Sequence, residues 1–120
     1  MNMIEAIDTV EKTYEFMLAY AAQGRVNDED TSSTGIRADL TRLVEALGVI
    51  GAAKLEGEAA KKFLEVVRQD AAKASAAIGL VLSKPGISSQ AVDNINASIH
   101  IRALLTDLFI LDETLKITGG

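Results

Sequence analysis

The sequence predicts an all-α protein, an antiparallel up-down-up-down four-helix bundle. Two observations favour this fold. The 120 residues include one proline and are rich in alanine, leucine, glutamate and lysine, which have high helix propensity. Apolar residues also recur at alternating intervals of three and four along four segments, the spacing that keeps one side of a helix against its neighbours. Because a chain of this length is about one ordinary domain, we expect residues 1–120 to form a single four-helix bundle domain.

The first predicted helix covers residues 2–24. Asn2, with Glu5 three residues later, resembles a capping box, in which each side chain accepts a hydrogen bond from the other residue's backbone N–H. Gly24 can end the helix in a left-handed conformation, which costs glycine little. These signals predict both ends of the first helix.

The second and third predicted helices follow a polar loop. Ser33 or Thr34 can cap a helix over residues 34–56, because a hydroxyl at this position accepts from the first free N–H groups of a helix. Gly57 separates this helix from a third one over residues 58–84. The short connection predicts that the two helices are antiparallel neighbours.

The fourth predicted helix covers residues 88–117, starts at Ser88 or Ser89, and carries two apolar rows. The rows lie on opposite sides when each residue advances the helix by about 100°. One row holds Val92, Ile95, Ile99, Ala103, Thr106, Ile110 and Ile117. The other row, which we call the leucine row, holds Ile101, Leu104, Leu108, Leu111 and Leu115.

The leucine row predicts an interface, because a helix in a monomeric bundle usually needs only one covered row. Five uncovered branched aliphatic side chains would form a large apolar patch on a monomer. We therefore expect a homodimer with a twofold axis near the fourth helix, and the leucine row as its contact residues. Two alternatives remain open: a tilt that lets the helix's own neighbours cover both rows, and a separate protein partner or apolar ligand.

Asp70 interrupts the apolar row of the third helix. A buried carboxylate without a partner is costly, so an inward Asp70 would need a polar side chain beside it. The candidates for that side chain are Tyr14, Arg102 and His100. The alternative is a slight rotation of the helix that leaves Asp70 at the boundary, near Arg68 or Lys73.

The chain lacks the usual ligands for a metal or cofactor. It has no cysteine and a single histidine, His100. Bundles that bind iron or manganese carry Glu-x-x-His pairs, but Ala97 stands three residues before His100. We therefore expect no metal, no cofactor and no catalytic residue. An enzyme that uses Asp70 and His100 as acid and base remains a third possibility.

Charge and composition narrow the partners and the location. The net charge is −5 and no basic stripe is present, which disfavours nucleic acid and anionic membrane surfaces as partners. No apolar run reaches the roughly 20 residues that span a bilayer. The first residues do not resemble a secretory signal, and the lack of cysteine fits the cytoplasm, where we expect the protein.

The sequence thus predicts a non-enzymatic helical-bundle protein. It would act by self-association or as an adaptor for another protein, through apolar helix faces. The alternative is a bundle that binds a small apolar ligand in a pocket between its helices. In that case Tyr14, Asp70 and His100 are the possible polar anchors for the ligand.

Overall fold

A computed structural model describes residues 1–28 and 35–117, with side chains up to Thr114. Over these residues the chain forms five helices and no strand. They are α1 (Met3–Ala21), α2 (Ile36–Ala52), α3 (Glu58–Leu82), α4 (Ser89–Ala97) and α5 (Ile99–Ile117). The predicted all-α class is confirmed, but five helices are present where four were predicted.

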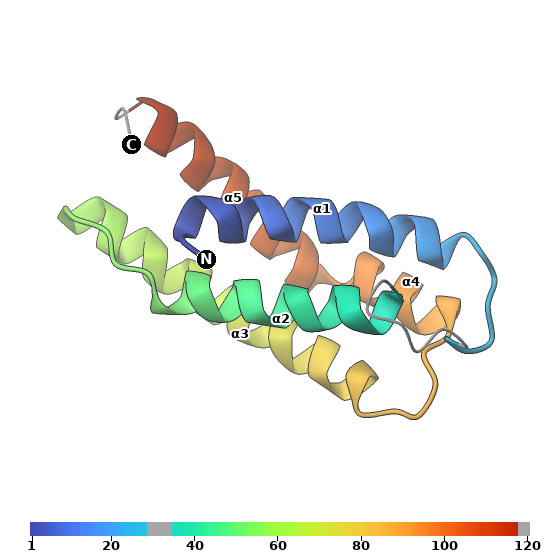
Figure 1. Cartoon of the computed structure of the whole chain (residues 1–120). Coiled ribbons are helices and arrows are strands. Elements are labelled where there is room, and N and C mark those ends of the chain that lie inside the picture. Colours follow the sequence, from blue (N-terminus) through green and yellow to red (C-terminus); the bar gives the residue numbers. More distant parts are fainter. Residues whose placement is uncertain (29–34, 118–120) are drawn as a thin grey trace.

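The helices form an elongated bundle with extents of 46 × 22 × 21 Å. α1 packs along α2, and α2 along α3, with each pair running in opposite directions (Figure 1). α4 packs mainly on α1, whereas α5 packs mainly on α3. The start of α3 and the end of α5 diverge at one end of the bundle (Figure 1). This divergent end is where the candidate site lies.

The signals predicted for the ends of the first helix are present. Asn2 Oδ1 accepts a hydrogen bond from the Glu5 N–H at 2.8 Å, and the Glu5 carboxylate accepts from the Asn2 N–H at 3.1 Å. Gly24, three residues beyond α1, has a φ of 65°, and Gly57, just before α3, has a φ of 97°. Both glycines occupy the region of backbone space in which other residues are strained.

The remaining helix starts are only partly as predicted. Ser88, one of the two predicted candidates, caps α4 by accepting from the Ala91 N–H at 3.0 Å. The predicted caps of the second helix, Ser33 and Thr34, lie outside the described residues. α2 follows Gly35, which makes no side-chain capping bond.

The hydrophobic core runs along the bundle and receives side chains from every helix. Burying a large aliphatic side chain contributes roughly 1.5–3 kcal/mol, so this row of contacts is the main stabilising term. The side chains with no more than 1% exposure that fill it include Val10, Met17, Leu40, Leu43, Ile50, Leu64, Ile78, Val92, Ile101, Leu104 and Leu108.

The segment predicted as one fourth helix is divided at Ser98. This residue has an extended backbone, with φ −62° and ψ 137°. Its N–H donates to the Ile95 carbonyl at 3.0 Å, and its hydroxyl oxygen accepts from the His100 N–H at 3.1 Å. A serine hydroxyl that accepts from the second N–H of a helix is an N-cap. Ser98 therefore ends α4 and starts α5, and the prediction of one continuous helix is wrong.

Hydrogen bonds fasten α4 and the turn before it to α1. The Tyr20 hydroxyl donates to the Ile87 carbonyl at 2.5 Å, and the Ser89 hydroxyl donates to the Tyr20 carbonyl at 2.7 Å. Further along α4, the Asn96 side-chain amide donates to the Met17 carbonyl at 3.2 Å. Because these three bonds are buried, breaking one would leave a polar group without a partner, so they fix α4 against α1.

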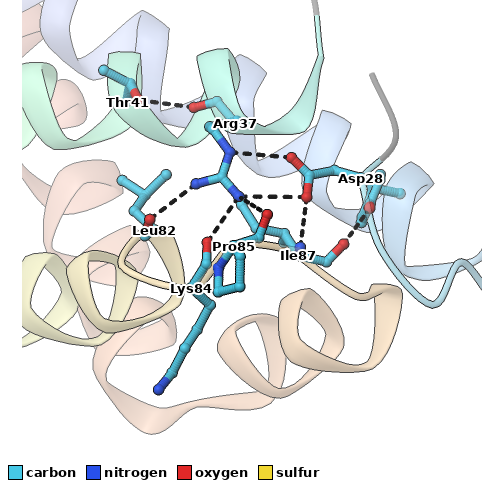
Figure 2. A network of polar contacts seen from close by, with 8 residues as sticks. Asp28, Arg37, Thr41, Leu82, Lys84, Pro85 and Ile87 are labelled. Carbon is cyan, nitrogen blue, oxygen red and sulfur yellow. Dashed lines mark hydrogen bonds and ion pairs between the residues drawn. The ribbon is translucent and has the colours of Figure 1, made fainter. Parts of the chain in front are cut away.

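Arg37 joins three segments at the end of the bundle away from the start of α3 (Figure 2). Its guanidinium pairs with the Asp28 carboxylate at 3.2 Å and donates to the carbonyls of Leu82 at 2.9 Å and Lys84 at 3.0 Å. Asp28 also accepts from the Ile87 N–H at 2.6 Å. Burial opposes the charged form of Asp28, but its hydrogen bonds outweigh burial, so the pKa of its carboxyl lies below the ordinary value.

Arg68 of α3 has the reciprocal role at the end of α2. It donates to the Gly51 carbonyl at 2.9 Å and to the Ala53 carbonyl at 2.7 Å. The last carbonyls of a helix lack intrahelical donors and carry partial negative charge. Each of these two antiparallel helices therefore supplies an arginine, Arg37 or Arg68, to the carboxyl end of the other.

Candidate functional site

The leucine row of α5 lies inside the bundle. Ile101, Leu104, Leu108 and Leu111 are each at most 4% exposed in a single chain. The fifth member, Leu115, lies among the last residues of α5, whose side chains are outside the described part. The premise that this row is uncovered in a monomer is therefore wrong for the four described residues. Its apolar character gives no reason to place an interface there.

The break at Ser98 explains this error. In α4 the buried row passes through Val92 and Asn96. Continued with spacings that alternate between four and three, that row would next reach Ile99, which is instead 72% exposed. The buried row of α5 begins at Ile101, two positions later, which is a rotation of about 200°. The segment does carry two apolar rows, and each of its two helices buries a different one.

The uncovered apolar residues of α5 therefore belong to the other row and its flank. Ile99 at 72% and Ile110 at 49% exposure are members of the row that begins at Val92. Phe109, on the flank of the helix, is 54% exposed. Ile99 and Ile110 lie three turns apart along α5, and only Ile110 borders a cavity described below.

A groove of about 690 Å³ opens between the start of α3 and the second half of α5. It lies at the divergent end of the bundle (Figure 1). Its polar lining comes from Glu56, Glu58 and Thr114. Its apolar lining comes from Leu55, Ala59, Ala60, Phe63, Ile110 and Leu111. We call it the α3–α5 groove, and its size is within the roughly 300–1,000 Å³ of typical ligand clefts.

A second, smaller cavity of about 280 Å³ adjoins the groove, because Leu55 lines both. The charged residues that line this cavity are all basic: Lys54, Lys61 and Arg68. The charged residues of the α3–α5 groove, Glu56 and Glu58, are acidic. This end of the bundle thus carries acidic groups along the groove and basic groups along the adjoining cavity.

Two carboxyl groups, of Asp70 and Asp107, meet where α3 packs on α5. Asp107 is 8% exposed, and no donor among the described residues reaches its buried Oδ2. Asp70 is half-buried and shares a side-chain hydrogen bond with Asp107. Two ionised carboxylates only accept, so a hydrogen bond between these two carboxyl groups forms only when the pair carries a proton. Burial first, and then the hydrogen bond with Asp70 and its charge, raise the pKa of Asp107 to about 7.

The three predicted ligand anchors are not brought together. Tyr14 is half-buried on α1, and His100 is half-buried in the first turn of α5. No hydrogen bond or ion pair joins Tyr14, His100 and Asp70 among the described side chains. None of the three lines the α3–α5 groove, the cavity beside it, or the two other cavities found near the loops of the opposite end.

Asp70 has a different partner from those that the sequence suggested. It meets Asp107, whereas Arg68 is engaged by carbonyls of α2 and by Glu65. Asp107 itself was overlooked as a site residue. The signal that could have identified it is a lone carboxylate within the apolar stretch "LLTDLFIL", next to the leucine row.

The described residues offer no metal centre, since no group of three or more of their His, Asp and Glu side chains is placed to hold a metal ion. Within the same part of the chain, every helix is too short or too polar to cross a membrane. Comparisons of the chain with family models, with curated proteins and with solved structures found no match.

Replacing Asp107 by asparagine is expected to stabilise the protein at neutral and alkaline pH. The raised pKa of Asp107 means that the folded state holds its proton between about pH 4 and pH 7, while the unfolded state releases it. This contribution to stability is full below about pH 4 and is lost as the pH rises through about 7. An asparagine side chain does not ionise in this range. The free energy of unfolding of the Asp107→Asn variant should therefore not fall in this way as the pH rises through about 7.

The measurement is urea unfolding of wild type and Asp107→Asn at a series of pH values. At pH 8 the variant should be more stable by on the order of 2–4 kcal/mol, since one pKa unit corresponds to about 1.4 kcal/mol. Asp93→Asn, at an exposed aspartate of α4, is the matched control and should follow wild type. Identical pH dependence in wild type and Asp107→Asn would contradict the burial of an acid pair.

Proposed function

We propose that the protein is a non-enzymatic helical bundle of the cytoplasm that acts by self-association, with a second copy seated on the α3–α5 groove. The observation that supports this proposal is the uncovered apolar lining of the groove. In this proposal α4 and α5 together take the place of the fourth helix of the bundle. The chain then keeps the antiparallel up-down-up-down topology predicted from its sequence. The predicted homodimer is retained, but its contact surface moves from the leucine row to the groove.

The groove supplies the apolar centre that an interface needs. Ile110 is 49% exposed there, and Leu55 and Phe63 are only partly buried. Fully burying a side chain of this kind contributes roughly 1.5–3 kcal/mol to the free energy of binding, because its apolar surface is removed from water. The exposed apolar surface thus favours an occupant that presents an apolar face of its own.

The charges around the groove favour a second copy as that occupant. In a twofold interface the same surface patch of each copy faces the other, so every contact between two different residues occurs twice. Glu56 and Glu58 on the groove, with Lys54 and Lys61 on the adjoining cavity, give one end of the molecule both signs of charge. In the proposed dimer, a half-turn about an axis near Leu55, which lines both cavities, brings the acidic groups of one copy to the basic groups of the other.

A small apolar ligand is the second candidate occupant, and the volume of about 690 Å³ is the observation that favours it. The polar anchors would then be Glu56, Glu58 and Thr114 rather than Tyr14, Asp70 and His100. Acidic anchors of this kind would select a ligand with a hydrogen-bond donor or a positive charge beside its apolar body.

The self-association proposal predicts that Ile110→Glu makes the protein monomeric, while Ile99→Glu does not. Both isoleucines are exposed on α5, but only Ile110 lines the groove. The substitution is the same at both positions, so a difference between the two variants reports the location of the interface. Sedimentation velocity at micromolar concentration should give a dimer for wild type and for Ile99→Glu. A glutamate in the groove would bring an unpaired charge into the interface, which is costly.

Two other results would contradict self-association through the groove: a monomeric wild type, or equal dimerisation of both variants. If wild type is monomeric, native mass spectrometry of the protein from its own host distinguishes the second candidate. A bound adduct that Ile110→Glu loses and Ile99→Glu keeps would support the apolar ligand in place of a second copy.

Charge reversal tests the twofold pairing separately. A basic variant, Glu56→Lys with Glu58→Lys, and an acidic variant, Lys54→Glu with Lys61→Glu, should each dimerise more weakly than wild type, because like charges then meet across the axis. Mixed together, the two variants should form heterodimers. The twofold arrangement is excluded if each variant dimerises as wild type does, or if the mixture behaves as the sum of its parts.

A further inference from the structure

The acid pair of Asp70 and Asp107 lies on the same helices as the α3–α5 groove. Asp107 precedes Ile110 and Leu111 by three and four residues, so it lies one turn away on the same side of α5. Asp70 follows Phe63 by seven residues, two turns further along α3. The pair therefore joins the two helices just beyond the inner end of the groove.

We propose that the Asp70–Asp107 pair is a proton-dependent clasp, which holds α3 against α5 while it carries a proton and lets the groove widen when the proton leaves. With the proton present, one carboxyl donates to the other, and the pair has one negative charge fewer in its buried position. Without the proton, two negative charges face each other in a poorly hydrated seam.

The unprotonated pair is unstable as it stands for two separate reasons. Like charges that share a site repel, and a buried carboxylate without a donor is destabilised by its removal from water. Separation of α3 from α5 relieves both, because it increases the distance between the charges and admits water to Oδ2 of Asp107. α3 and α5 already diverge at the groove, so this end of the seam is the part that can open (Figure 1).

Among the described residues, one titratable group shifts the pKa of Asp107. Asp70 is the titratable group that faces it from α3, and it contributes both a hydrogen bond and a charge. α4 and α1 also contact α5, but none of their described acids or bases acts on Asp107, and neither does His100 on α5 itself. The pKa of about 7 places the release of the proton close to neutral pH.

Widening of the groove would expose more of its apolar lining, so self-association should strengthen as the pH rises. This second step rests on the proposed function, whereas the movement of α3 relative to α5 does not. The two steps can therefore be measured separately and can fail separately.

The movement is tested by electron-spin distance measurement between α3 and α5. The chain has no cysteine, so Lys62→Cys and Glu113→Cys, both at exposed positions, accept spin labels without competition. Raising the pH from about 5 to about 8.5, on either side of the transition, should lengthen or broaden the distance distribution by several ångströms. The same labels in an Asp107→Asn background should report one distribution at both pH values, and Asp70→Asn provides the same test from the other helix.

The result that overturns the clasp is an unchanged distance in the wild-type background, or an equal change in the Asp107→Asn and Asp70→Asn backgrounds. Sedimentation of unlabelled protein at the same two pH values then tests the second step. Wild type should dimerise severalfold more tightly at the higher pH, and Asp107→Asn should show no such difference. A distance change without a change in dimerisation would retain the clasp and reject its connection to self-association.

Discussion

The extended conformation of Ser98 is the constraint on which the rest of the structure depends. By ending α4 and capping α5, this residue rotates the buried row by about half a turn within one segment. α4 can then bury Val92 against α1, while α5 buries Leu104 and Leu108 and packs on α3. A continuous helix would have had to leave one of these apolar rows in water. The break allows a single chain to cover the leucine row by itself.

The two ends of the bundle are built from different interactions. At one end, Arg37 and Asp28 bind the loops to the carboxyl end of α3 through charge-assisted hydrogen bonds (Figure 2). At the other end, α3 and α5 are joined by two acids and leave an apolar groove. The first end is closed by the Asp28–Arg37 ion pair, whereas the second end has an unfilled apolar groove beside the acid pair of Asp70 and Asp107. Conformational freedom and binding are therefore expected at the second end.

Local signals in the sequence were sufficient for the helical class and for four helix ends among the described residues. The Asn2–Glu5 capping box, Gly24, Gly57 and Ser88 depend on residues within a few positions of each other, so the sequence shows them directly. Ser98 carried a similar signal, since serine favours N-caps. It was missed because the apolar spacing continues through it, and spacing alone cannot show where a helix is interrupted.

The site could not be predicted because it depends on contacts between distant segments. Asp70 and Asp107 meet only through the packing of α3 on α5, and the groove exists only because these helices diverge. The pattern did identify Asp70 as anomalous in an apolar row, but it could not name its partner. The prediction of two apolar rows in residues 88–117 was sound, whereas the choice of which row faces water required knowledge of the break.

The most direct test of this account is the free energy of unfolding of Leu104→Ala compared with Leu18→Ala, at low and high protein concentration. Leu104 is fully buried in the leucine row, and Leu18 is 47% exposed on α1. Leu104→Ala should lose about 2–5 kcal/mol and Leu18→Ala about 1 kcal/mol or less. The difference should be unchanged over roughly a hundredfold range of concentration if one chain buries the row alone. A small loss for Leu104→Ala, or one that appears only where the protein is associated, would contradict it.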